Sequence, residues 1–206
     1  MNHLRPAIML TAFFVVVTGI AFPLLIWAIG QVAFPSHAEG SLLRDSHGTV
    51  VGSTLIGQSF TRPEFFHPRP SAAGAGYDAA NSSGTNLGPT SDKLVNGVPD
   101  DKATPDVDES YAGYRQLAAQ YRQENGLAPD SIIPADAATR SASGLDPHIT
   151  PRNAELQVRR VALARGLPQA QVRALVAQNT EGRTLGLFGE PRVNVLRLNI
   201  ALTELE

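Results

Sequence analysis

The sequence contains no cysteine, which excludes disulfide bonds, thiolate metal sites and cysteine nucleophiles. Its five histidines form no HxxxH or HxH pair, and no carboxylate-rich loop has calcium spacing, so we expect no metal ion. The sequence also lacks the GxxxxGK[ST] loop that wraps a phosphate and the GxSxG elbow that presents a nucleophilic serine. The net charge of −2 is close to zero, so composition indicates no nucleic-acid partner.

Charge is nevertheless distributed unevenly along the chain. Residues 36–146 carry 8 Lys and Arg against 14 Asp and Glu, whereas residues 147–197 carry 8 Arg against 3 Glu. This distribution is typical of solvated helix faces, and the alternative is an anionic partner or ligand bound by the second segment.

Residues 7–30 form a long apolar run without a charged side chain. As a helix rising about 1.5 Å per residue, the run would be about 36 Å long, more than the ~30 Å hydrocarbon core of a bilayer. The sequence therefore predicts a short cytoplasmic N-terminus at 1–6, a transmembrane helix at 7–30 and a soluble domain at 31–206.

Three residues within the apolar run depart from its aliphatic pattern. Thr18, Gly19 and Pro23 are all tolerated inside a membrane helix, and Pro23 favours a kink because it lacks an N–H group. The small residues Thr18 and Gly19 would let another helix approach closely. We expect these three positions to contact other membrane helices.

The orientation of the predicted helix follows from the charges before it. Arg5 and the terminal amine favour an N-terminus inside the cell, which places the soluble domain on the outer face of the membrane. A cleaved signal peptide is the competing interpretation, since Ser36-His37-Ala38 resembles a small-x-small cleavage site. The apolar run of 24 residues exceeds the usual signal-peptide core of about 7–15, which favours retention.

The soluble part begins with strand signals and ends with helix signals. Residues 41–58 alternate short apolar runs with a turn at 46–48, which predicts two or three short strands. Helices are predicted over 110–125, over 151–165 and from 168 onward, and the C-terminal segment predicts a short strand passing into a helix. These elements indicate an α+β or α/β domain with about four helices.

The segment 71–109 is rich in Gly, Ser, Asn and Pro and contains few large apolar side chains. A loop of this length in a compact domain is either functional or a floppy surface excursion. Its acidic residues could shape a surface for a partner.

The segment 141–150, SASGLDPHIT, combines turn and capping residues. Gly144 permits a positive φ, Asp146 favours an Asx-turn, and Thr150 caps the helix that follows. The segment is therefore either a structural turn or an anion site at a helix N-terminus. Gln157 on that helix is either a surface residue or a hydrogen-bonding group for a ligand.

Taken together, several long stretches resemble one family, the small C subunit of the Kdp-type potassium-transporting ATPase of bacteria. They occur in the family's order and cover most of the chain outside residues 96–135. Two departures are SSGTN in place of SGGSN, and Arg159 where the family generally has proline. The similar stretches are LRPA with the apolar run after it, GSTLIGQSFTRPEFFHPRPSAAGAGYD, SSGTNLGPTS, SASGLDPHITPRNAELQVRRV and EGRTLGLFGEPRVNVLRLNIAL.

The resemblance implies a non-catalytic accessory subunit that stabilises a high-affinity potassium uptake complex and raises the ATP affinity of its catalytic subunit. It implies three partners in the bilayer: the catalytic P-type ATPase subunit, a channel-like potassium-binding subunit and a further small membrane peptide. It also implies a nucleotide contact at Gln157, with Gly144, Asp146 and His148 nearby. The topology argues against direct ATP binding, because ATP is cytoplasmic. A membrane-anchored extracytoplasmic binding protein or enzyme is the alternative interpretation.

Overall fold

A computed structural model describes residues 3–45, 47–99 and 110–205 of the chain, which separates into two compact units, Met1–Leu42 and Leu43–Glu206. The predicted turn residue Ser46 and the acidic positions 100–109 lie outside the described residues.

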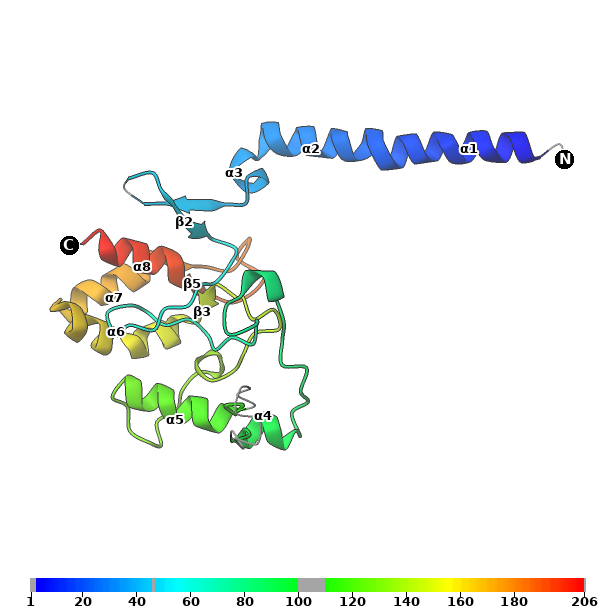
Figure 1. The fold of residues 1–206 in the computed structure, drawn as a ribbon. Helices are drawn as coiled ribbons and strands as arrows, with labels where there is room; N and C mark the ends of the chain where they lie inside the picture. The colour runs from blue at the N-terminus through cyan, green and yellow to red at the C-terminus, as the bar shows by residue number, and fades with distance from the viewer. Residues whose placement is uncertain (1–2, 46, 100–109, 206) are drawn as a thin grey trace. The chain divides into compact units, whose positions relative to one another are not determined.

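The first unit is built on one apolar helix, in which α1 (Leu4–Val16) continues through a π-helical turn (Val17–Ala21) into α2 (Phe22–Ala33) (Figure 1). Its 30 residues have a mean hydropathy of 2.4 over the most apolar window, and none of that window is buried within the protein. In the described part of the chain this is the one helix long and apolar enough to cross a membrane. The helix extends a few residues beyond the predicted limits of 7–30 at both ends.

The three unusual residues of the helix gather at its π-helical turn. Thr18 and Gly19 belong to that turn, and the Thr18 hydroxyl donates to the Phe14 carbonyl at 2.6 Å. Pro23 lies two residues after the turn, and because it has no N–H it interrupts the regular series of backbone hydrogen bonds. After α2, Phe34 leaves the helical conformation and Pro35 starts the single turn α3 (Pro35–Ala38).

The described part of the second unit contains two small sheets, the first of which begins at the boundary residue Leu42. Strands β1 (Leu42–Arg44) and β2 (Val50–Ser53) pair with each other, and the Asp45 carboxylate accepts the backbone N–H groups of His47 and Thr49 in the turn between them. The other sheet is made of β3 (His148–Ile149), β4 (Thr180–Glu181) and β5 (Arg192–Asn194). Its order is β3-β5-β4, and both pairs are antiparallel.

The helices of this unit confirm most of the expected pattern. The predicted strand-to-helix passage near the C-terminus is present as β5 and α8. The four long helices match the number expected, while α4 is a short addition inside the predicted loop. The helices are α4 (Asp92–Asn96), α5 (Tyr114–Glu124), α6 (Pro151–Arg165), α7 (Gln169–Gln178) and α8 (Val195–Thr203).

The limits of α6 follow from its capping residues. The Thr150 hydroxyl accepts the Asn153 N–H at 3.1 Å, Pro151 occupies the first helical position, and Gly166 ends the helix with φ of 66°. Helix α5 begins later than the predicted residue 110, because Tyr111 instead forms a bridge with Val98. The Gln116 side chain then caps the new start by accepting the Gly113 N–H.

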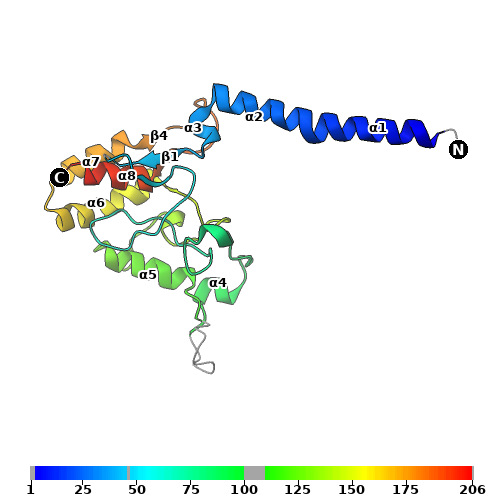
Figure 2. The same cartoon turned by 45° about the horizontal axis from the view of Figure 1, so that its top comes forward.

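The core lies where α6, α7 and α8 pack against one another and against the three-stranded sheet (Figures 1 and 2). Burying a Val, Leu, Ile or Phe side chain in this core stabilises the fold by about 1.5–3 kcal/mol. Phe66, from an irregular segment far away in the sequence, completes the core. Its fully buried apolar members include Phe66, Ala154, Val161, Val172, Val193, Leu198 and Leu202.

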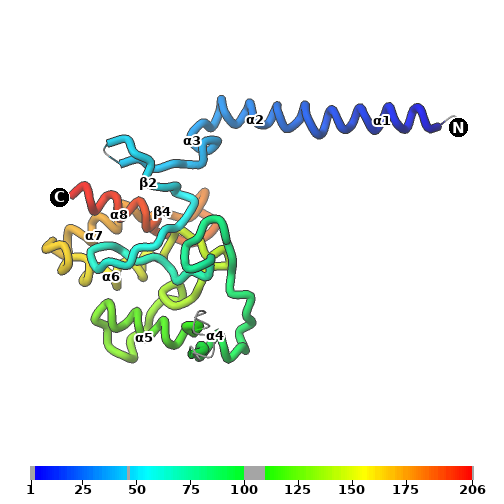
Figure 3. Tube along the Cα trace, in the orientation of Figure 1, coloured from blue at the N-terminus to red at the C-terminus, as the bar shows by residue number. Residues whose placement is uncertain are grey.

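A long irregular segment, residues 54–91, joins β2 to α4 and crosses the domain with only one 3₁₀ turn, Ala79–Asn81 (Figure 3). The first part of the predicted 71–109 loop is tied to the 141–150 segment. The Ser71 hydroxyl donates to the Gly144 carbonyl at 2.7 Å, Ser82 donates to Ser143 at 2.9 Å, and Ala73 is fully buried. The loop and the 141–150 segment therefore hold each other in place.

Candidate functional site

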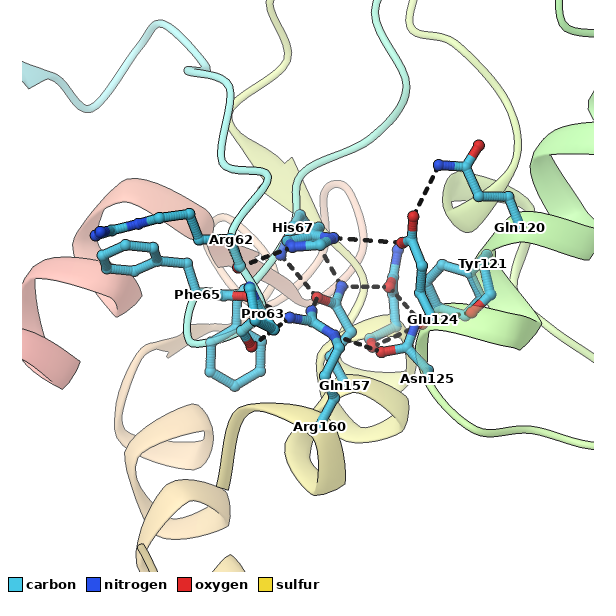
Figure 4. A network of polar contacts seen from close by, with 12 residues as sticks. Arg62, Pro63, Phe65, His67, Gln120, Tyr121, Glu124, Asn125, Gln157 and Arg160 are labelled. Atoms are coloured by element: carbon cyan, nitrogen blue, oxygen red, sulfur yellow. Dashed lines mark hydrogen bonds and ion pairs between the residues drawn. The ribbon is translucent and has the colours of Figure 1, made fainter. Parts of the chain in front are cut away.

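A buried polar cluster lies between α5, α6 and the irregular segment (Figure 4). Gln157, 1% exposed, is at its centre, so it is not the surface residue that one sequence interpretation allowed. Its Oε1 accepts the His67 N–H and an Arg160 N–H, both at 2.7 Å. Its Nε2 donates to the His67 carbonyl at 3.0 Å and to Asn153 Oδ1 at 2.9 Å. All four hydrogen-bonding positions of the amide are thus used within the protein.

Arg160, one turn after Gln157 on α6, ties the cluster to the irregular segment (Figure 4). It donates to the Pro63 carbonyl at 2.6 Å, the Phe65 carbonyl at 2.9 Å and Asn125 Oδ1 at 3.0 Å. Burial lowers the pKa of this guanidinium from its ordinary value. The side chain remains charged, because an arginine pKa starts far above neutral.

A histidine–carboxylate pair forms the open side of this cluster. His67 Nδ1 lies 3.5 Å from a carboxylate oxygen of Glu124, and Gln120 donates to the other oxygen at 2.7 Å. The contact from the His67 side chain holds the pKa of Glu124 below its usual range, against the opposing effect of burial. Both side chains line a pocket of about 340 Å³, together with Arg69 and Tyr77.

A second polar chain leads away from Gln157 through Asn153, which is also buried. Asn153 Oδ1 accepts the Tyr121 hydroxyl at 2.8 Å, and its Nδ2 donates to Asp136 at 3.0 Å. Asp136 in turn accepts the backbone N–H of Thr150 at 2.7 Å. Burial raises the pKa of Tyr121, so its hydroxyl stays protonated and donates.

The 144–148 turn forms a separate site. Arg69 donates to Asp146 at 2.8 Å, and the His148 N–H donates to the same carboxylate at 3.0 Å. Burial raises the pKa of Asp146, but the contacts from His148 and Arg69 outweigh it and set the pKa at about 2. Asp146 and His148 line a pocket of about 320 Å³ with Arg69 and Arg192.

Gly144 occupies a position that no other residue fits without strain. Its φ is +69°, and a Cβ there would lie 2.7 Å from both the Ala73 nitrogen and the Ser83 carbonyl oxygen. The left-handed conformation expected from the sequence is therefore confirmed, and its reason is the close approach of the 71–83 backbone.

The structure thus brings together only part of the predicted set. Asp146 and His148 share a pocket, Gly144 supports their turn, and Gln157 belongs to the other cluster. Because Gln157 has no free donor or acceptor, the arrangement does not fit a nucleotide held by its side chain. In the described ranges no group of three or more His, Asp or Glu side chains is placed to hold a metal ion.

Sequence reasoning missed several residues that build these clusters. His67 and Arg69 lie in a proline-rich stretch without periodicity, and the partners of Arg160 are up to 97 residues away along the chain. Glu124 and Asp136 look like ordinary surface carboxylates in the sequence. The one available signal was the excess of arginine after residue 147, of which Arg160 is a member.

The fold and the site define a class: a membrane-associated protein with one apolar N-terminal helix and an α+β domain whose polar clusters are joined mainly to its own backbone. The model of the family described as "K+-transporting ATPase, c chain" matches residues 4–204. The chain belongs to this family, KdpC, and the resemblance noted in its sequence is confirmed.

Similar proteins carry the name "Potassium-transporting ATPase KdpC subunit". The one from Caulobacter sp. (strain K31) is 50% identical over 202 residues, covering 98% of this chain and 93% of the relative. The one from Koribacter versatilis (strain Ellin345) is 48% identical over 201 residues, covering 98% and 94%. The one from Mycobacterium bovis (strain BCG / Pasteur 1173P2) is 47% identical over 204 residues, covering 99% of both.

Proposed function

We propose that this chain is the non-catalytic accessory subunit of an ATP-driven potassium uptake complex. It would stabilise the assembly of the catalytic P-type ATPase subunit with the channel-like potassium-binding subunit and a small membrane peptide. Membership of the KdpC family supports the proposal, since the relatives are named as subunits of a potassium-transporting ATPase.

The observation that carries the proposal is the apolar helix Leu4–Ala33, none of whose most apolar window is buried within the protein. One helix alone cannot enclose an ion pathway, because polar groups in a membrane need partners away from lipid. The helix therefore acts by packing against other membrane subunits. Thr18, Gly19 and Pro23, at or beside its π-helical turn, are the proposed contacts, because small residues and an interrupted ladder allow close approach.

The domain is proposed to lie on the outer face of the inner membrane, because Arg5 and the terminal amine favour an inside N-terminus. There it would dock on the potassium-binding subunit near the point of ion entry. The effect on ATP affinity that the resemblance implies would then pass through the assembled complex. The internal use of every Gln157 hydrogen-bonding position supports this view.

The proposed role predicts which proteins accompany the chain. A tag after Glu206, followed by mild detergent extraction, is expected to recover the catalytic and potassium-binding subunits, identified by mass spectrometry. Deleting the chain is expected to abolish most potassium-dependent ATPase activity of the membranes. Recovery of the chain alone, with turnover or ligand binding by the purified chain, would instead favour a membrane-anchored enzyme or binding protein.

The proposed orientation predicts which side of the membrane is labelled. The natural absence of cysteine means that one introduced thiol is the only one present. Ala174→Cys, on an exposed position of α7, is expected to react with a membrane-impermeant maleimide in intact spheroplasts. His3→Cys, the matched control before the helix, is expected to react only after permeabilisation. The reverse labelling pattern would place the domain in the cytoplasm and overturn the topology.

A further inference from the structure

The loop between β4 and β5, residues 182–191, presents three large apolar side chains to solvent. Leu185, Leu187 and Phe188 are 84%, 74% and 65% exposed, although they lie within four consecutive residues. Single exposed apolar residues are ordinary on a protein surface, but such a concentration at one loop tip commonly marks an interaction site. We call residues 182–191 the apolar loop.

The apolar loop is held in one conformation by its own backbone. Thr184 and Phe188 exchange two backbone hydrogen bonds of 2.8 and 2.9 Å, and the Gly186 N–H donates to the Arg183 carbonyl at 3.0 Å. Leu185 has φ of +56°, a left-handed conformation that is costly for a bulky side chain. Strain at an exposed residue contributes nothing to core packing, and strained residues of this kind cluster at functional sites. The backbone hydrogen bonds therefore already hold the loop in a shape that exposes its apolar side chains.

Ion pairs surround the base of the apolar loop. Nη2 of Arg183 donates to both carboxylate oxygens of Glu190, at 2.7 Å each. Arg192 and Arg197 both contact Glu181, at 3.0 and 3.3 Å. Every arginine near the loop thus has a carboxylate partner. An apolar centre inside a rim of paired charges is the arrangement found at protein–protein interfaces.

We propose that the apolar loop docks into an uncharged, apolar recess on the outer face of a membrane subunit of the pump. This inference rests on the proposed function and names the segment that makes the contact. A lipid surface fits the loop less well, because binding to an anionic membrane surface is strengthened by unpaired Lys and Arg side chains. Arg183, the arginine within the apolar loop, is instead paired with Glu190.

Site-specific photocrosslinking tests the contact in the full-length chain within membranes that hold the whole complex. Leu187→p-benzoylphenylalanine is expected to crosslink to a membrane subunit of the pump, identified by mass spectrometry. Leu163→p-benzoylphenylalanine, at an equally exposed leucine (71%) on α6, is the matched control and is expected to crosslink little. Crosslinks from residue 187 to a second copy of this chain, to lipid alone or to nothing would overturn the inference.

A second variant measures how much the contact contributes. Replacing Leu185, Leu187 and Phe188 together by serine is expected to weaken binding to the pump's membrane subunits by about tenfold or more, as for central interface residues. Thermal unfolding of the purified chain in detergent should be unchanged, because the three side chains are exposed. Leu163→Ser is the control for a lost surface leucine.

The outcomes separate this inference from the proposed function. If the unaltered chain recovers no pump subunit, the proposed function fails and the inference fails with it. If the unaltered chain and the serine variant recover the subunits equally well, the proposed function stands and the apolar loop is not the docking segment.

Discussion

Replacing Arg160 by methionine is expected to lower the free energy of unfolding by about 3 kcal/mol, because the change removes one charged partner from a largely buried network. The variant leaves the carbonyls of Pro63 and Phe65 and the side-chain oxygen of Asn125 without their donor. Methionine keeps most of the apolar contact of the arginine stem, so the loss reports the hydrogen bonds. Thermal unfolding in detergent should show a decrease of about 10 °C.

The neighbouring residue supplies a matched control. Arg159 is exposed on α6, and within the described residues its side chain makes no hydrogen bond or ion pair. Arg159→Met is therefore expected to change the free energy of unfolding by less than about 0.5 kcal/mol. Equal effects of the two substitutions would mean that the cluster around Gln157 does not hold the irregular segment.

Replacing Gly144 by alanine is expected to have an effect of similar size, about 3 kcal/mol, through two additive causes. The residue has φ of +69°, which costs any L side chain about 1 kcal/mol or more. In addition, the new Cβ would lie 2.7 Å from backbone atoms of Ala73 and Ser83, which cannot move independently of their chain. Chemical unfolding of the purified chain measures the loss.

Two other glycines separate these causes. Gly166 has φ of +66°, and a Cβ added there would have no atom within 4 Å. Gly166→Ala should therefore lower the free energy of unfolding by about 1 kcal/mol. Gly182 has neither the left-handed φ nor a close neighbour, and Gly182→Ala should be nearly neutral. If Gly144→Ala lowers the free energy of unfolding no more than Gly166→Ala does, the contact between the 71–83 backbone and the turn is loose.

The elements with local signals could be predicted from the sequence. Helix α6 has the limits that the sequence predicts, because its start is set by Thr150 and Pro151 and its end by Gly166. The apolar helix Leu4–Ala33 and the strand-to-helix passage at β5 and α8 likewise follow from apolar runs and their periodicity. The start of α5 was missed because Tyr111 pairs with Val98, a contact that no periodicity reveals.

The polar clusters could not be predicted, because they depend on contacts between distant residues. Gln157 contacts His67, which is 90 residues earlier in the chain. A glutamine on a helix is usually exposed, and only the arrival of the irregular segment turns it into a buried pairing group. For the 144–148 turn, the sequence indicated a structural role or a ligand site, and the structure adds Arg69 as the partner of Asp146.

The two side-chain amides that bind the backbone of residues 66 and 67 are synthesised late, so folding of this part must wait for them. Asn199 on α8 exchanges hydrogen bonds with the Phe66 backbone, 133 residues earlier, as Gln157 does with His67. The irregular segment leaves the ribosome before either amide has been synthesised, so the backbone groups of Phe66 and His67 must wait for these partners. If the domain crosses the membrane during synthesis, completion of its core falls to its last helix and happens on the far side. The apolar helix Leu4–Ala33 is then already in the bilayer, and it keeps the newly folded domain close to the subunits that it is proposed to contact.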